Sequence, residues 1–444
     1  MPESRQRTVE ERRAFGRSLR DKCPRSYHSG WKLQTKRDIL PLVVAAQAGR
    51  IPKLLPHKYQ LMAASPFSFY RGSVWLMASD LSRMANSTLE AQICGDAHIR
   101  NLGAYAAPDG ALVFDLNDFD ETNRAPFEWD LKRLAASVEL AARGGGLEEK
   151  CARAAIATVI EAYRNTIAEL AEMPFADLVR YRVRHVEHND LIHLLMRKAE
   201  RKSPLDSLRS LTTGDGRTPK FKNHPPELVP VSGKTRALLE AALRDYRRTL
   251  SPQHQELLDR YVPVDFAFKM VGTGSVGLRD YVVLLLGNGS QDQPARDPLF
   301  LQIKQAVPSA YVPFQHPSAA SWHEQGRRVV EGQRKMQTQS DPLLGWTTID
   351  SRDYIVRQLN DHKASLDPAD VAHPGALQHF GTVCGAVLAR AHSRTADPGV
   401  IHGYCGDNEK LDVSLAAFAR AYADQVDADY TVFKKLLRQG KLPS

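Results

Sequence analysis

An aspartate and an asparagine lie five positions apart in the segment Gly-Asp-Ala-His-Ile-Arg-Asn, residues 95–101. A second polar run, Asp-Leu-Asn-Asp-Phe-Asp-Glu at residues 115–121, follows a short apolar stretch. Phosphoryl transfer uses such side chains: one carboxylate lies at the attacking hydroxyl, and an asparagine and a second carboxylate hold Mg²⁺. The alternative is a set of Asp and Asn residues that cap turns, which is a common use of both residues.

The residue types in these two segments suggest separate roles. We expect Asp96 to be the catalytic carboxylate, and His98 to act as a second catalytic residue, either as a base or by orienting the loop. Asn101 would bind the metal ion together with Asp115 or Asp118. The separation from Asn101 favours Asp115, whereas the local Asp-Phe-Asp sequence favours Asp118, so both remain open.

A nucleotide site would complete this chemistry, and a glycine-rich segment lies between two apolar stretches at 264–271 and 280–286. The second stretch reads as a strand, which excludes the dinucleotide-binding pattern, because that pattern opens a helix. A glycine loop between two strands is typical of kinases, where backbone N–H groups approach nucleotide phosphates. A glycine-rich hairpin with no ligand is the alternative. The candidate cofactor-binding residues of this loop are Gly272, Thr273, Gly274, Ser275 and Gly277.

Lys304 lies in the next apolar stretch, residues 298–306. A lysine in an apolar strand is rarely without a partner. We expect its partners to be nucleotide phosphates and a glutamate on the following helix, with Glu331 as the first candidate and Glu324 as the second. The alternative is a lysine at a sheet edge whose ammonium group reaches water.

The elements that would position these residues are predicted from hydrophobic periodicity and turn residues. Asp130 follows Pro126 at the start of a helix, where it can complement the helix dipole or brace the loop at 95–101. The predicted strands are 101–105, 112–116, 264–271, 280–286, 298–306 and 353–359, and the first two form a hairpin. The predicted helices are 65–84, 126–142, 147–173, 321–339, 374–394 and 413–438, with further helices within 174–260.

This pattern indicates an α+β chain with four regions. They are a basic N-terminal arm at 1–44, a mostly helical large lobe at 45–260 with the loop and hairpin, a small antiparallel β lobe at 261–360 with the glycine loop and Lys304, and C-terminal helices at 361–444 that pack on the large lobe. A solvated leader is the expected state of the arm, because it is rich in Arg and Lys and poor in large apolar residues.

Residues 95–101 resemble the Gly-Asp-x-His-x-x-Asn loop of aminoglycoside-phosphotransferase-type kinases. Residues 112–115 and 118–119 resemble the metal-binding strand of these enzymes, and the glycine loop with Lys304 resembles the kinase small lobe. In such kinases the glycine loop and lysine precede the catalytic loop, whereas here they follow it. The resemblance therefore implies a two-lobed protein-kinase-like fold in circularly permuted order, with ATP and Mg²⁺ as cofactors.

The unpermuted alternative would put the catalytic loop at residues 401–408, after the helix at 374–394. That segment lacks an aspartate after His402-Gly403, and no strand pair with a metal-binding carboxylate follows it. We therefore reject this alternative.

A second resemblance covers residues 45–435. This part of the chain is similar to an uncharacterised bacterial family, domain of unknown function 2252, in stretches that include 65–67, 95–101, 114–121, 128–131, 271–277, 331–333 and 422–425. The resemblance implies no particular reaction.

Composition limits the possible partners. The net charge of +9 favours anions such as nucleotides and permits nucleic acid, but no basic–aromatic stacking pattern or known binding motif accompanies it. No apolar run reaches the roughly 20 residues of a membrane span, and residues 1–20 do not resemble a secretory signal. The five scattered cysteines form no CxxC pair, which favours reduced thiols in a cytoplasmic protein.

The sequence therefore predicts an ATP- and Mg²⁺-dependent phosphotransferase that acts on a hydroxyl acceptor of unknown identity. Three alternatives remain: nucleotidyl transfer on the same scaffold, a nucleotide-binding protein without catalysis, and a basic nucleic-acid-binding protein.

Overall fold

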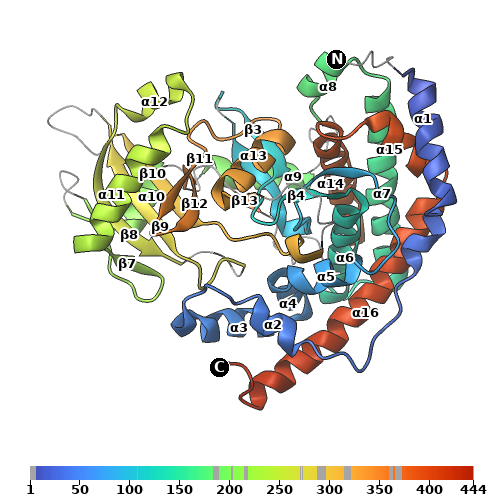
Figure 1. Cartoon of the computed structure of the whole chain (residues 1–444), viewed down its shortest axis with the longest axis horizontal. Coiled ribbons are helices and arrows are strands. Elements are labelled where there is room, and N and C mark those ends of the chain that lie inside the picture. Colours follow the sequence, from blue (N-terminus) through green and yellow to red (C-terminus); the bar gives the residue numbers. More distant parts are fainter. Residues whose placement is uncertain are drawn as a thin grey trace.

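The computed structural model describes residues 7–107, 109–183, 190–201, 204–214, 219–270, 272, 274–287, 297–314, 322–359, 364–365 and 373–443. The chain is a mixed α+β protein with antiparallel sheets, as the sequence predicted. Figure 1 shows the largest sheet at the left, beside its own helices, and the long helices of the chain gathered at the right.

The largest sheet has six strands in the order β11-β12-β10-β9-β8-β7. Its strands are β7 (Leu228–Pro230), β8 (Val262–Lys269), β9 (Asp280–Leu286), β10 (Pro298–Gln305), β11 (Gly345–Ile349) and β12 (Arg352–Gln358). The predicted strands within 264–306 are present as β8, β9 and β10. The short strands β7 and β11 were not predicted.

Side chains alternate between the two faces of β10. Leu299, Leu301 and Ile303 pack against helix α11 (Gly233–Arg247), together with Phe266 and Val283 of the neighbouring strands. Phe300 belongs to the hydrophobic cluster on the opposite face. Because Lys304 has the same parity as Phe300, it lies on the face away from α11.

Two smaller sheets carry the polar loops. Strand β1 (Glu90–Ile93) pairs antiparallel with β4 (Asn123–Pro126), and the hairpin of β2 (Leu102–Ala106) and β3 (Leu112–Leu116) has β13 (Ala364–Ser365) at its edge. Ile93 lies opposite Asn123, and Leu102 lies opposite Leu116. The connections 94–101 and 117–122 both join these two sheets, and they therefore lie side by side.

The helices before the large sheet are α1 (Val9–Ser18), α2 (Leu40–Ala45), α3 (Leu55–Ala63), α4 (Pro66–Gly72), α5 (Val74–Leu81), α6 (Glu128–Gly144), α7 (Glu149–Ala171), α8 (Phe175–Arg180), α9 (Asp190–Glu200) and α10 (Pro204–Leu211). The remaining helices, besides α11, are α12 (Pro252–Leu258), α13 (Gln325–Met336), α14 (Pro374–Ser393), α15 (Pro398–Cys405) and α16 (Lys410–Arg438). The single helix predicted at 65–84 is broken at Ser73, between α4 and α5.

The described part of the N-terminal region is packed on the protein instead of forming a solvated arm. Arg12 pairs with Asp397 at 3.1 Å, and the Arg13 Nε donates a 2.9 Å hydrogen bond to the Nδ1 atom of His402. Both partners belong to the helix α15 region, which also contains most of the rejected segment 401–408. The basic residues of this region thus bind the C-terminal helices.

The helical part of the chain has one large hydrophobic core, to which α6, α7, α14 and α16 all contribute. Its first and last segments are therefore folded together, although the β-rich segment separates them in sequence. No helix within the described residues has both the length and the apolar character that crossing a membrane requires.

Helices α7 and α14 approach each other closely at Gly385. A Cβ atom at this position would lie 2.1 Å from the carbonyl oxygen of Val159. Two helix backbones cannot absorb such a clash by a side-chain rotation, so the glycine is required by packing.

We predict that Gly385→Ala lowers the free energy of unfolding by about 1–3 kcal/mol, as expected for overpacking. Chemical denaturation of the full chain measures the change. Gly144→Ala is the matched control, because no heavy atom lies within 4 Å of its added Cβ. Equal stability of the two variants would contradict the close approach.

Candidate active site

Helix α6 positions the loop at 94–101 through three side chains on one of its faces. The Asp130 carboxylate accepts hydrogen bonds from the backbone N–H of Cys94 at 2.8 Å and of Gly95 at 2.9 Å. Arg133 binds Asp96, and the Ser137 hydroxyl accepts from the N–H of Ile99 at 3.2 Å. The helical repeat puts residues 130, 133 and 137 on the same face. Of the two roles expected for Asp130, the structure shows the bracing of the loop.

Asp130 is itself held from behind by the end of α14. The Nε2 atom of His392 lies 3.3 Å from the Asp130 carboxylate, and the Nδ1 atom of His392 lies 2.9 Å from the Tyr163 hydroxyl. All three side chains are buried. Helices α6, α7 and α14 thus meet beneath the loop.

Gly95 allows the two polar loops to touch. Its φ angle of +81° lies in the left-handed region, and a Cβ atom there would lie 2.3 Å from the carbonyl oxygen of Glu121. The Gly95 carbonyl also accepts a 2.7 Å hydrogen bond from the Tyr311 hydroxyl. A larger residue at this position would separate the loop of Asp96 from the loop that contains Asp118.

Asp96 forms a buried ion pair with Arg133. The Nε and Nη2 atoms of Arg133 both lie 2.6 Å from the Oδ1 of Asp96. Arg133 is fully buried, and its guanidinium stacks 4.2 Å above the centre of the Tyr70 ring. Burial raises the pKa of Asp96, although the attraction of Arg133 opposes this shift. The result is a fixed carboxylate with a raised affinity for a proton.

His98 lies beside this carboxylate, with its Nε2 atom 3.7 Å from the Asp96 Oδ2. Burial, and then the charges of Arg71 and Arg133, hold the pKa of His98 well below its usual value. The imidazole is therefore neutral at neutral pH. Asn101 closes the loop by donating a 2.9 Å hydrogen bond from its Nδ2 to the Asp96 carbonyl oxygen.

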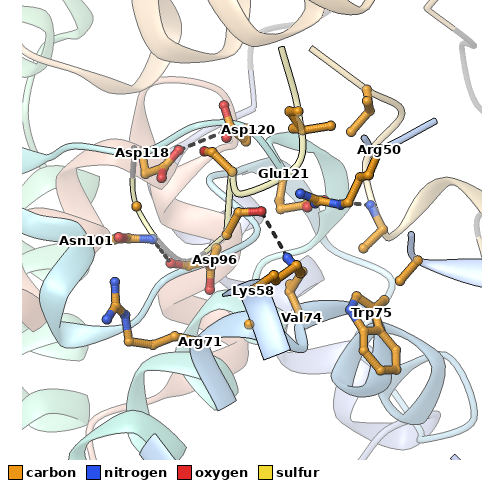
Figure 2. A pocket seen from close by; sticks show the side chains of 18 of the residues that line it. Arg50, Lys58, Arg71, Val74, Trp75, Asp96, Asn101, Asp118, Asp120 and Glu121 are labelled. Carbon is orange, nitrogen blue, oxygen red and sulfur yellow. Dashed lines mark hydrogen bonds between the residues drawn. The ribbon is translucent and has the colours of Figure 1, made fainter. Parts of the chain in front are cut away.

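A cavity of about 190 Å³ lies between this loop and the glycine-rich loop (Figure 2). Asp96, His98, Asn101 and Asp118 line it on one side. The glycine loop contributes Gly272, Gly274 and Ser275. Two segments more than 150 positions apart in the sequence thus face the same cavity.

Two further positions of the predicted loop have a different status. Thr273 lies outside the described residues. Gly277 is not part of the cavity lining. Its carbonyl oxygen accepts a 2.7 Å hydrogen bond from the N–H of Ile51.

The Lys304 ammonium pairs with Asp120, with 2.5 Å between the Nζ and the Oδ2 atoms. The side chain of Lys304 is only 4% exposed. Burial disfavours its charge, but the attraction of Asp120 and Asp118 outweighs burial, so the pKa of Lys304 is raised. Lys304 is therefore a charged group that connects the large sheet to the acidic loop.

The partner of Lys304 differs from the two glutamates expected. Glu324 is half-exposed and lies 3.7 Å from Arg327. Glu331 is not among the buried residues of α13. Arg328 of the same helix donates hydrogen bonds to the carbonyl oxygens of Asp120 and Thr122 in the acidic loop. Glu331 is half-buried, and the described contacts include none between it and Lys304.

Asp118 and Asp115 have different surroundings. Asp118 lines the cavity, and its Oδ1 accepts a 3.2 Å hydrogen bond from the N–H of Asp120. Asp115 is absent from that lining and is 1% exposed. It binds the Arg390 guanidinium at 2.5 Å and the N–H of Thr338 at 3.0 Å. Of the two carboxylates left open by the sequence, Asp118 is the one that a ligand in the cavity can reach.

The donor set for a metal ion is small. Among the residues that the structure describes, no three His, Cys, Asp or Glu side chains gather into a metal-binding group. Mg²⁺ is commonly held by one or two carboxylates together with substrate phosphates. Asn101 and Asp118 fit an arrangement of this kind, in which substrate phosphates would complete the coordination.

Two basic residues that hold the glycine loop were not predicted from the sequence. Arg50 donates a 2.6 Å hydrogen bond to the Val276 carbonyl oxygen, and Lys58 donates one of 3.2 Å to the Gly274 carbonyl oxygen. Both cations line the cavity, and burial together with the charge of Arg50 holds the pKa of Lys58 well below its usual value. A lysine within the apolar helix α3 was the available hint.

Asp280 is a further buried acid on the Lys304 face of the sheet. It lies opposite Lys304 in the pairing of β9 with β10, and its Oδ2 accepts a 2.7 Å hydrogen bond from Gln302. Burial raises the pKa of Asp280 to about 7, although Lys304 opposes the shift.

The fold and the cavity define a mixed α+β protein in which an acidic loop pair faces a glycine-rich loop. The chain belongs to the family described as uncharacterized protein conserved in bacteria (DUF2252), which matches residues 50–436. No curated protein and no solved structure matches the chain. The family expected from the sequence is thereby confirmed, and its description assigns no reaction.

We predict that Asp280 makes the protein less stable as the pH rises from about 4 to about 7. The folded state keeps the proton through this window while the unfolded state loses it, so unfolding becomes easier until both forms are ionised. Asp280→Asn should flatten this slope and be more stable than the wild type at pH 8. Urea denaturation across pH measures both effects.

The control for this experiment is Asp350→Asn, at a side chain that is 75% exposed. It should keep the wild-type slope. Parallel curves for the wild type and Asp280→Asn would contradict a raised pKa at Asp280.

Proposed function

We propose that this chain is an ATP- and Mg²⁺-dependent phosphotransferase with a kinase-like fold in circularly permuted order. One observation carries the proposal: Asp96, Asn101 and Asp118 share a cavity with the glycine loop. Kinases need a base, an asparagine and a metal-binding carboxylate on one side of the phosphates, and a glycine-rich loop on the other.

The order of elements in the large sheet supports a kinase-like small lobe. The glycine loop joins β8 to β9, Lys304 lies on the next strand, and helix α13 follows before β11 and β12. Kinases use a glycine loop, then a strand lysine, then a helix. The shared core of α6, α7, α14 and α16 supports the permutation, because it joins both ends of the chain into one helical body.

The charges in the cavity suit a triphosphate. Lys58 and Arg50 line the cavity and contact the glycine loop, while Lys304 lies behind the lining and pairs with Asp120, which belongs to it. Phosphate oxygens would replace part of the present partners of these three residues. Asn101 and Asp118 would hold Mg²⁺ together with phosphate oxygens. The ion, when bound, neutralises charge on the transferred group.

Asp96 has the properties of a base for the acceptor hydroxyl. Arg133 fixes its Oδ1, while its raised pKa favours acceptance of a proton. The neutral His98 beside it adds no competing positive charge. Placement of a hydroxyl between this carboxylate and the γ-phosphate is worth several kcal/mol of the barrier.

The size of the cavity indicates which part of the nucleotide it takes. A volume of about 190 Å³ is below the roughly 300–1,000 Å³ of typical ligand pockets. The charged phosphate end fits this space, so a whole nucleotide requires outward movement of the glycine loop. Gly272 and Gly274 are exposed, which permits this movement.

We predict that the wild type binds MgATP in calorimetric titrations and that Lys304→Ala weakens binding at least tenfold, because a phosphate-binding charge is lost. Lys150→Ala, at a lysine 75% exposed, is the control and should bind as the wild type does. Absence of binding by the folded wild type at millimolar ATP would end the proposal.

Asp96→Asn should keep nucleotide binding and lower ATP turnover about 10²–10⁴-fold, as expected for loss of a general base. Turnover with water as acceptor can be followed by release of products. ADP with phosphate indicates phosphoryl transfer, whereas release of pyrophosphate indicates nucleotidyl transfer and would correct the reaction class.

We also predict that Mg²⁺ alone binds weakly and that its binding depends on ATP, because the protein offers few ligands. Asp118→Asn should abolish the Mg²⁺ dependence of ATP binding. Asp115→Asn should instead destabilise the fold by about 3–5 kcal/mol, since it leaves the Arg390 charge buried without its partner. Titration with Mg²⁺ and thermal unfolding separate the two effects; the reverse outcome would assign the metal to Asp115.

A further inference from the structure

Arg71 projects into the cavity near Asp96 and Asn101 (Figure 2). It comes from α4, whose first turn is capped by Ser65. Within the described residues, its buried Nε has no hydrogen-bond partner. No hydrogen bond or ion pair among the described contacts joins it to Asp96, whose Oδ1 binds Arg133, or to Asp118, whose Oδ1 accepts from the Asp120 N–H.

A second arginine beside Arg71 makes the lack of a counter-ion more costly. The Nε of Arg100 is also buried without a hydrogen-bond partner among the described residues. Burial, and then repulsion from Arg100, lowers the pKa of Arg71 to about 10. Neither guanidinium group is paired with a carboxylate among the described residues, and two neighbouring unpaired positive charges favour an anion.

The position of Arg71 separates it from the groups that hold the glycine loop. Arg50 and Lys58 contact the carbonyl oxygens of that loop, and Lys304 contacts Asp120. The acids whose charges raise the pKa of Arg71 are Asp96 and Asp118, the proposed base and metal ligand. An anion bound to Arg71 would therefore lie on the Asp96 side of the cavity, opposite the glycine loop.

We propose that Arg71, assisted by Arg100, binds an oxyanion group of the acceptor, so that the acceptor is a hydroxyl compound that also carries a phosphate or carboxylate group. Guanidinium groups bind both kinds of group through paired N–H donors. The assignment of the anion to an acceptor rests on the proposed function. The anion site itself does not depend on it.

The group-transfer step then has a defined geometry. The acceptor hydroxyl oxygen forms a bond to the γ-phosphorus of ATP, the bond from that phosphorus to the β–γ bridging oxygen breaks, and ADP leaves. The hydroxyl proton passes to Asp96. Arg71 acts as a positioning residue that holds the acceptor so that its hydroxyl faces Asp96.

The test uses inorganic phosphate and acetate as probes, titrated calorimetrically into the full chain saturated with Mg²⁺ and the β,γ-imido analogue of ATP. We expect one of the two anions to bind, and Arg71→Gln and Arg100→Gln each to weaken that binding at least tenfold. The anion that binds identifies the group on the acceptor. Arg248→Gln, at a side chain 78% exposed, removes the same charge elsewhere and should change nothing.

Three other results are informative. Binding of neither anion overturns the proposal, and so does binding that the nucleotide analogue abolishes, because the site would then belong to the terminal phosphate of the nucleotide. Arg71-dependent anion binding by a protein that binds no nucleotide supports the anion site, while it removes the proposed kinase function.

Thermal unfolding distinguishes a binding role of Arg71 from a structural one, because loss of a structural residue lowers the unfolding temperature. Because its buried Nε has no partner and it faces a like charge, Arg71→Gln should unfold no earlier than the wild type without ligands. Arg133→Gln should unfold earlier, since it leaves Asp96 without its partner. A large loss of stability in Arg71→Gln, shared by Arg100→Gln, would overturn the proposal.

Discussion

The loop that carries Asp96 is fixed by one face of one helix. Asp130, Arg133 and Ser137 of α6 bind Cys94, Gly95, Asp96 and Ile99 in sequence. A helix is the stiffest short element available, so it transfers the position of the helical core directly to the loop. The remaining parts of the cavity are placed relative to this loop: the acidic loop by its contact with Gly95, and the large sheet through Lys304.

Buried ion pairs connect segments that are distant in sequence. Asp96 pairs with Arg133, Asp120 with Lys304, and Asp115 with Arg390. Such pairs add little net stability, because desolvation offsets the attraction, but they penalise any arrangement that separates the partners. Here they join the loop of Asp96 to α6, the loop of Asp120 to β10, and strand β3 to α14. Arg71 differs from these residues, because it has similar acidic surroundings and yet forms no ion pair with an acid among the described residues.

The cavity is lined by both basic side chains and carboxylates, which suits a ligand of mixed character. Phosphate oxygens can satisfy Lys304, Lys58 and Arg50, while a metal ion or a hydroxyl proton can satisfy Asp118 and Asp96. The glycine loop adds backbone groups that can approach an anion without steric hindrance. The proposed combination of a nucleotide, its metal ion and an acceptor would supply both kinds of group.

The sequence by itself determined the local elements. The hairpin of β2 and β3, the strands β8 to β10 and the helices α6 and α7 follow from hydrophobic periodicity and turn residues, which act over a few positions. The candidate residues Asp96, Asn101 and Lys304 were also visible, because polar side chains are conspicuous beside apolar strands. The brief strands β7 and β11 carry too little periodic signal to be recognised.

The tertiary structure decided which of these residues meet. Lys304 binds Asp120, which lies 184 positions earlier in the chain, instead of a glutamate of the following helix. Asp115 and Asp118 are chemically identical and three positions apart, yet only Asp115 meets Arg390, which lies 275 positions away in the chain. Spacing along the chain cannot report such contacts, because they depend on how separate elements pack. For the same reason, the sequence could not show that the Nε of Arg71 has no hydrogen-bond partner among the described residues.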